Sequence, residues 1–101
     1  MVFTIKNKLS AKEAAIALLY EVSEALEELN ITKQPYIFVR NDDCIVIVRI
    51  EFRFDNIKYN KVFEQIFGIN DRYTIGNIRC IKNHFVDFVR CWGFVGVPKN
   101  E

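Results

Sequence analysis

The chain has 101 residues, of which 50% are apolar and 14% aromatic, and its formal net charge is +1. This length predicts one domain, residues 1–101, with a core that needs no metal or disulfide. A net charge so near zero argues against binding to nucleic acid or membranes through bulk electrostatic attraction. Three Cys without paired spacing suit a reducing compartment, and no apolar run approaches the ~20 residues of a membrane span, so we expect a soluble cytoplasmic protein.

The N-terminal residues predict a short strand followed by a helix. Residues 2–7 resemble the first-strand signature of RNA-recognition motifs, but the second signature of that family does not follow, so an ordinary edge strand over residues 2–6 is favoured. Ser10 and Glu13 have the spacing of a capping box, and Asn30 suits the left-handed residue that ends a helix. Between them, apolar residues recur at helical spacing: Ala15, Leu18, Leu19, Val22, Ala25, Leu26 and Leu29. The five Glu of this helix are interpreted as a solvated face, with a surface for a basic partner as the alternative.

The stretch from Cys44 to Asp55 has the clearest strand pattern in the sequence. Its even positions are all apolar and are predicted to form one buried face: Cys44, Val46, Val48, Ile50, Phe52 and Phe54. Its odd positions begin apolar, at Ile45 and Ile47, and become polar in the second half. Residues 36–40 predict a second strand, and the polar turn 41–43 joins the two strands in a hairpin.

Two further helices are predicted after the hairpin. Residues 59–67 carry apolar side chains at helical spacing, and Gly68 is expected to end that helix. Residues 77–92 also have an apolar seam at helical spacing, with Asn77 as the N-terminal cap. A hairpin turning near residues 82–84 is the alternative, because the Ile, Val and Phe of this stretch are mediocre helix formers.

Together these elements predict an α+β fold. An antiparallel sheet is built on the central hairpin, and helices pack on one face of it in a ferredoxin-like or related order. Short strands at residues 72–75 and 94–97 are expected to widen the sheet.

Two sets of residues have the side-chain types that metal chemistry requires, and neither has the spacing. Asp43, Glu51 and Arg53 resemble the motif of metal-dependent nucleases, but one strand separates the two carboxylates by about 26 Å, and an Arg is a poor replacement for the usual Lys. The second set forms a stripe on the last helix: Cys80, His84, Asp87 and Cys91. Its two Cys would lie ~16 Å apart, too far for one metal. We therefore predict no catalytic residue, cofactor or metal site, and rank a nuclease-like enzyme third among the functions.

The apolar start of the outer strand face predicts a surface that a monomer would leave bare. Ile45 and Ile47 point away from the main core, beside Tyr36 and Phe38 or their neighbours. We predict a small non-catalytic interaction protein that forms a homodimer, or binds another protein, through these four side chains. The alternative is an RNA- or DNA-binding module in which Arg side chains beside the aromatic rings grip phosphates or stack on bases: Arg40, Arg49 and Arg53.

Overall fold

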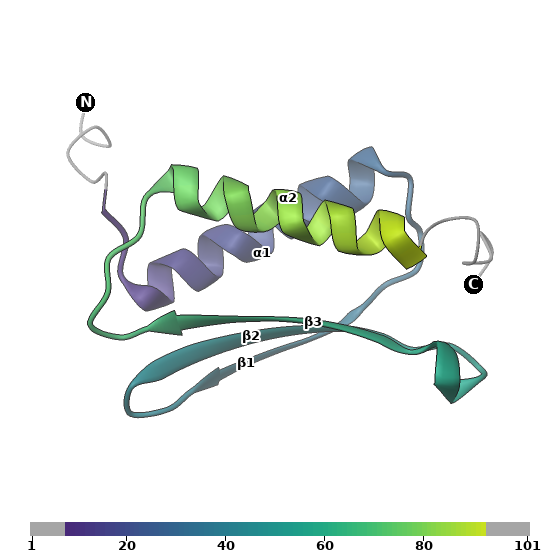
Figure 1. Cartoon of the computed structure of the whole chain (residues 1–101), viewed down its shortest axis with the longest axis horizontal. Helices are drawn as coiled ribbons and strands as arrows, with labels where there is room; N and C mark the ends of the chain where they lie inside the picture. The colour runs from purple at the N-terminus through teal and green to yellow at the C-terminus, as the bar shows by residue number, and fades with distance from the viewer. Residues whose placement is uncertain (1–7, 93–101) are drawn as a thin grey trace.

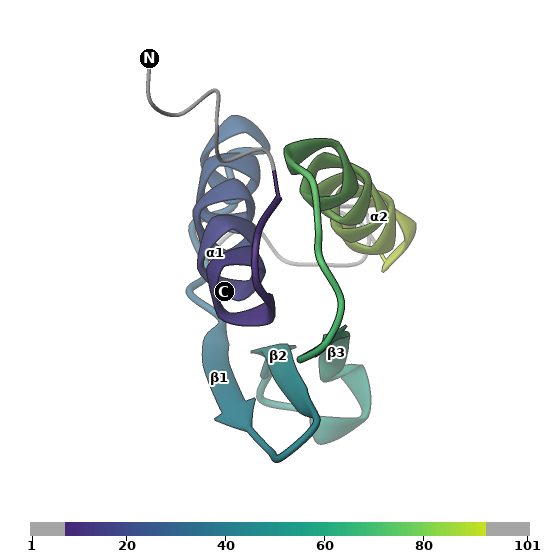
Figure 2. The ribbon, with the colours of Figure 1, turned by 90° about the vertical axis from the view of Figure 1, so that its left-hand side faces the viewer.

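The computed structural model describes residues 8–92 and has the α+β fold that the sequence predicts. In chain order its elements are α1 (Ala11–Glu28), β1 (Tyr36–Asn41), β2 (Ile45–Phe52), the 3-10 helix η2 (Ile57–Tyr59), β3 (Lys61–Gly68) and α2 (Ile75–Trp92) (Figure 1). The strands form one antiparallel sheet in the order β1-β2-β3, and both helices lie on one side of it (Figure 2). The strands predicted at residues 2–6 and 94–97 lie outside the described residues.

The first helix begins and ends as its sequence predicts. The backbone N–H of Glu13 donates to Ser10 Oγ at 3.2 Å, and the N–H of Ser10 donates to Glu13 Oε1 at 2.9 Å, so the capping box is complete. Asn30 has a φ of 58°, the left-handed conformation that ends many helices. Small and branched side chains fill the face toward the sheet: Ala11, Ala14, Ala15, Leu18, Val22 and Ala25 are buried.

The central hairpin is also confirmed. Tyr36 lies opposite Glu51 and Asn41 opposite Val46, so β1 and β2 pair along their whole common length. The buried face of β2 holds four of the six residues assigned to it: Val46, Val48, Ile50 and Phe52. The prediction for Cys44 was wrong, because the strand begins one residue later and leaves this thiol exposed in the turn.

The helix predicted over residues 59–67 is wrong, because this stretch contains strand β3. Phe63 and Phe67 point toward the helices, while Val62 and Ile66 point to the other side of the sheet. Apolar residues at such spacing fit one stripe of a helix and a strand with two apolar faces equally well. Pairing with β2 favours the strand, and the described element order is therefore α-β-β-β-α, so a ferredoxin-like order is not confirmed.

The last predicted helix is confirmed as α2, and the hairpin alternative is wrong. Its first turn is closed by reciprocal bonds, in which Thr74 N–H donates to Asn77 Oδ1 at 2.9 Å and Asn77 N–H donates to Thr74 Oγ1 at 3.0 Å. Thr74 is therefore the cap that was assigned to Asn77. The strand predicted at residues 72–75 reduces to one bridge, in which Tyr73 N–H donates to the Leu9 carbonyl at 2.9 Å.

Contacts between β3, α2 and α1 complete the core. The Phe63 ring lies 5.2 Å from that of Phe85 and 5.5 Å from that of Phe88, between ring centroids. Lys82 Nζ on α2 lies 3.5 Å from Glu21 Oε1 on α1. Part of the acidic surface of α1 therefore faces a cation of the same chain and not an external partner.

Candidate interaction surface

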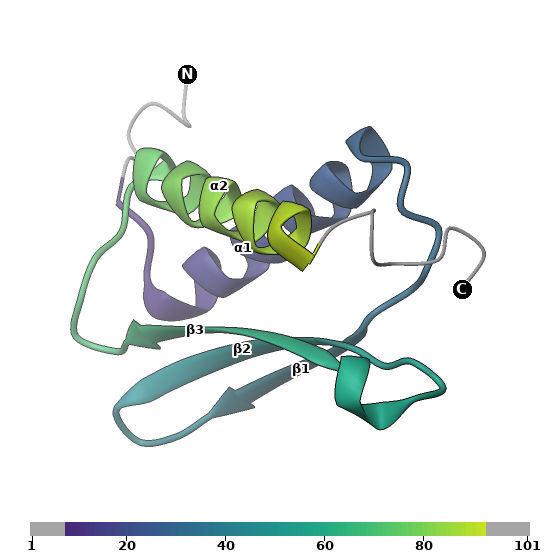
Figure 3. The same cartoon turned by 45° about the vertical axis from the view of Figure 1, so that its right-hand side comes forward.

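The side of the sheet that faces away from both helices, called the outer face from here on, carries the site residues predicted from the sequence. Side chains alternate across a strand, so the register places these outward: Tyr36, Phe38 and Arg40 of β1; Ile45, Ile47, Arg49 and Glu51 of β2; Val62, Glu64 and Ile66 of β3. Within residues 8–92, no helix or strand covers this face (Figure 3). The residues predicted for a protein interface and for nucleic-acid binding thus share one surface.

The four side chains predicted for the interface lie on two neighbouring strands of the outer face. On β1, Tyr36 is 51% exposed and Phe38 is 45% exposed. Ile45 and Ile47, near the hairpin turn on β2, are less exposed than these two aromatic residues. Tyr36 lies opposite Glu51, six residues along β2 from Ile45, which is a separation of about 20 Å. Between these two ends, Phe38 is the diagonal neighbour of Ile47 and lines the same hollow, and Ile47 lies opposite Ile66, so apolar side chains also cross the sheet beside the charged ones.

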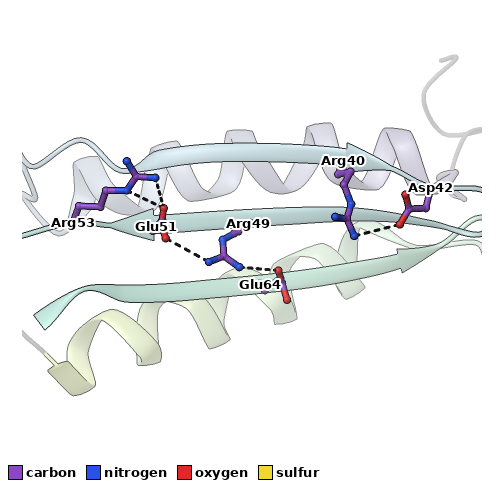
Figure 4. A network of polar contacts seen from close by, with 6 residues as sticks. All are labelled: Arg40, Asp42, Arg49, Glu51, Arg53 and Glu64. Atoms are coloured by element: carbon purple, nitrogen blue, oxygen red, sulfur yellow. Dashed lines mark hydrogen bonds and ion pairs between the residues drawn. The ribbon is translucent and has the colours of Figure 1, made fainter. Parts of the chain in front are cut away.

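A chain of ion pairs crosses the outer face (Figure 4). Arg53 donates to Glu51 Oε1 from Nε at 2.9 Å and from Nη2 at 2.7 Å. Arg49 lies between two carboxylates, 3.4 Å from Glu51 Oε2 and 3.4 Å from Glu64 Oε2. Because exposed ion pairs contribute little to stability, their main effect here is to hold the side chains in place and to balance their charges.

Glu51 is the centre of this chain of ion pairs. The hydrogen bonds from Arg53 lower the pKa of the Glu51 carboxyl, and the carboxylate in turn raises the pKa of Arg53. With its guanidinium held by Glu51, Arg53 lies 4.0 Å from the ring centroid of Tyr36 and 6.0 Å from that of Phe38. The aromatic side chains of β1 therefore carry a fixed cation on the outer face.

An open hollow of about 400 Å³ lies on the outer face and is lined by Phe38, Arg40, Ile47, Arg49, Glu51, Arg53 and Glu64. Its three Arg are those predicted to bind nucleic acid, and each has a carboxylate neighbour, because Arg40 lies 3.3 Å from Asp42. Three cations facing three carboxylates leave no surplus positive charge for phosphates. Tyr36 and Phe38 stay about half exposed, although the Arg53 guanidinium already lies over the Tyr36 ring.

In the sheet formed by residues 8–92, β1 is an edge strand whose apolar side chains are all exposed: Tyr36 by 51%, Ile37 by 44%, Phe38 by 45% and Val39 by 47%. Val39 pairs with Val48, which is 0% exposed on the same side of the sheet, so the cover provided by the helices ends between β2 and β1. Natural edge strands usually carry charges or Pro that prevent pairing with another chain. β1 has Arg40 near its C-terminal end and Pro35 directly before it, but the four residues between them carry neither.

Sequence reasoning missed part of this surface. Ile37 and Val39 fit a buried strand face by pattern, and nothing in their spacing says that the helices stop short of β1. Val62, Glu64 and Ile66 were missed because β3 was interpreted as a helix. The signal available for a strand was the alternation of Val62, Glu64 and Ile66, in which a charged residue stands between two apolar ones. In the sheet, Glu64 lies opposite Arg49.

The residues considered for metal chemistry lie apart. Among residues 8–92, no three His, Cys, Asp or Glu side chains lie close enough to hold a metal ion. Asp43 is in the hairpin turn and Glu51 is near the far end of β2. The stripe on α2 is exposed at each position: Cys80, His84, Asp87 and Cys91.

No family model matches this chain, and no curated protein or solved structure shows a significant match to it. Over residues 8–92, neither helix combines the length and the apolar character needed to cross a membrane. The distinguishing features of the surface are an apolar edge strand and a charge-balanced outer face.

Proposed function

We propose that this chain is a small, non-catalytic, cytoplasmic interaction protein that forms a homodimer through β1. The observation that carries the proposal is the set of four consecutive apolar side chains on β1, each 44–51% exposed, on a strand that pairs on one side only within residues 8–92. Soluble monomers seldom leave contiguous apolar surface of this kind open, and an unpaired edge is a template for a further strand. A two-fold dimer is the commonest way to cover such a surface.

The size of this surface sets the expected strength of the dimer. Full burial of an aromatic side chain removes ~150–250 Å², so the half-exposed Tyr36 and Phe38 each have roughly 100 Å² left to bury. With Ile37 and Val39 the total stays well below the ~800 Å² per partner of a standard interface. We therefore expect a reversible dimer with a dissociation constant on the order of micromolar.

Sedimentation equilibrium over a range of micromolar concentrations tests this proposal. We expect the average mass of the wild type to rise from one chain toward two. The single variants Phe38→Lys and Val39→Lys place a charge on the outer face and on the helix side of β1, respectively. Each should keep the protein monomeric. The matched control is Tyr20→Lys, because Tyr20 is 72% exposed on α1, outside β1 and the outer face.

Thermal melting of each variant separates loss of association from loss of folding. Because Phe38 and Val39 are already half-exposed, their Lys variants should keep a cooperative melt at low concentration. A wild type that stays monomeric at every concentration would refute the proposal. Equal dimerisation of the wild type and both β1 variants would assign the association to another surface.

Binding of single-stranded RNA or DNA is the second candidate function. The observation in its favour is that Tyr36 and Phe38 expose their rings on an open antiparallel sheet, with Arg53 stacked 4.0 Å from the Tyr36 centroid. The paired carboxylates of Glu51 and Glu64 oppose it. Oligonucleotide binding that weakens with salt, and that Tyr36→Ala abolishes, would favour this function over the dimer.

A further inference from the structure

We infer that two copies pair β1 against β1 in antiparallel orientation, with Phe38 opposite Phe38 on the two-fold axis. This inference rests on the proposed homodimer and specifies its geometry. Three observations carry it: the direction of the backbone groups of β1, the residues that flank the strand, and the match of its side chains to themselves.

The hairpin closure shows which backbone groups face the free edge. Asp42 N–H donates to the Ile45 carbonyl at 2.8 Å, so Asp42 directs its N–H toward β2 at a hydrogen-bonded position of the β1–β2 ladder. Bonded and non-bonded pairs alternate along an antiparallel ladder, so Tyr36, Phe38 and Arg40 direct their backbone groups toward β2. The N–H and C=O groups of the residues between them therefore point out of the sheet edge: Ile37, Val39 and Asn41. Within residues 8–92, no other strand receives them.

This alternation restricts how a second β1 can pair. Outward-facing residues must meet outward-facing residues, so the two-fold axis has to pass through a residue position and not between two positions. A centre at Ile37 would place Val39 opposite Pro35, which has no N–H to donate. A centre at Val39 would place Ile37 opposite Asn41. A centre at Phe38 pairs Ile37 with Val39 in both directions and leaves Pro35 opposite Asn41 only at the two ends of the paired segment, outside the apolar residues 36–39.

The centre at Phe38 also matches the side chains on both sides of the sheet. On the helix side, Ile37 of each copy lies opposite Val39 of the other, which pairs β-branched residues throughout. On the outer face, Phe38 lies opposite Phe38, and Tyr36 of each copy lies opposite Arg40 of the other. Aromatic pairs and an Arg beside an aromatic ring are both favourable across strands.

The resulting assembly is a continuous sheet of six strands. A two-fold axis perpendicular to the sheet keeps both helix layers on one side and both outer faces on the other. Ile37 and Val39, which the helices of their own chain leave 44% and 47% exposed, would gain neighbours from the second copy. The pairing thus covers the part of the helix-side face that α1 and α2 do not reach.

Disulfide trapping tests this register. The background is a variant with all three native thiols removed by Cys44→Ser, Cys80→Ser and Cys91→Ser, each at an exposed position. Into it we would introduce Ile37→Cys, Phe38→Cys or Val39→Cys singly. Residues directly opposite each other lie within disulfide reach, whereas diagonal neighbours lie ~7–8 Å apart and do not. We expect Phe38→Cys alone to give a covalent dimer under mild oxidation.

The outcomes separate this inference from the proposed function. Trapping by Ile37→Cys or Val39→Cys in place of Phe38→Cys would overturn the register. A wild-type dimer in sedimentation with no trapping at any of the three positions would overturn β1 pairing while leaving the homodimer standing. A monomeric wild type would overturn both.

Amide hydrogen exchange on the unmodified protein gives an independent readout that does not depend on replacing Phe38. The amides of Ile37 and Val39 should exchange more slowly as the protein concentration rises, whereas the amide of Phe38, bonded to β2 in either state, should change little. Exchange at Ile37 and Val39 that is independent of concentration in a sample that dimerises would also overturn the inference.

Discussion

Two valines on neighbouring strands offer a sharp test of the claim that the helices leave β1 uncovered. Val39 and Val48 lie directly opposite each other in the β1–β2 ladder and point to the same side of the sheet. They differ in burial, because Val48 is 0% exposed and Val39 is 47% exposed. Comparing Val39→Ala with Val48→Ala therefore holds residue type and side-chain direction constant, while the burial and the position in the sheet, edge strand or central strand, differ.

The expected magnitudes follow from this difference. Truncation of Val48 removes two buried methyl groups, worth about 0.8 kcal/mol each, and leaves a cavity under α1, so we expect a loss of roughly 1.5–3 kcal/mol in the free energy of unfolding. The same truncation at the half-exposed Val39 should cost less than about 1 kcal/mol in the monomer, because about half of its surface already contacts water. Val48 should thus be the more sensitive site by about 0.5 kcal/mol or more.

Urea denaturation followed by circular dichroism is the assay, performed at a protein concentration low enough for the monomer to predominate. Equal m-values for the two variants would show that the difference lies in stability and not in the extent of unfolding. At higher concentration the effect of Val39→Ala should increase, because the β1 surface would then be buried in the dimer, while that of Val48→Ala should stay the same. Equal losses for the two variants at low concentration would refute the claim that β1 is uncovered.

Two further predictions concern single hydrogen-bonding groups. Tyr73→Phe removes the hydroxyl that accepts a hydrogen bond from Gly68 N–H at 2.7 Å, so urea denaturation should show a loss of about 0.5–1.5 kcal/mol in the free energy of unfolding. The control Tyr59→Phe, on the exposed η2, should leave the stability unchanged. Equal effects of the two substitutions would contradict this role of Tyr73. Because the pKa of Glu51 is lowered in the folded state, its contribution to stability is fully present above its unfolded pKa of about 4.3 and is lost as the pH falls through the lower folded value. Glu51→Gln should therefore lose less stability on acidification than the wild type, with Glu24→Gln on α1 as the control, and parallel acid profiles for all three would show that Glu51 is not a source of the pH dependence.

The parts of the fold that the sequence predicts are those in which local signals and burial agree. Ser10, Glu13 and Asn30 mark the ends of α1 by chemistry that needs no tertiary contact. The alternation along β2 is unambiguous because one of its faces is wholly apolar. The helix predicted over residues 59–67 was wrong because the apolar residues on both faces of β3 also have the spacing of a helical stripe. Only pairing with β2 distinguishes the strand from the helix.

The site was predictable only in part, for a different physical reason. The outward direction of Tyr36 and Phe38 follows from the hairpin, so the sequence places them on the correct face. The exposure of Ile37 and Val39 depends on how far α1 and α2 extend over the sheet, which is a property of helix packing and not of the strand itself. Burial on the helix side of an edge strand therefore cannot be inferred from its own alternation pattern.

The ion pairs of the outer face acquire a specific role if β1 pairs as inferred. Tyr36 already has the Arg53 guanidinium 4.0 Å from its ring centroid, and Arg40 of the second copy would approach the same ring from the free edge. Two cations beside one ring repel each other, and a carboxylate beside each cation offsets that repulsion. Glu51 lies directly opposite Tyr36 in the β1–β2 ladder, and like any carboxyl whose pKa is not raised it is ionised at neutral pH. The carboxylates that weaken the case for phosphate binding, Glu51 beside Arg53 and Asp42 beside Arg40, are thus the groups that would let two Arg share one aromatic side chain at a protein interface.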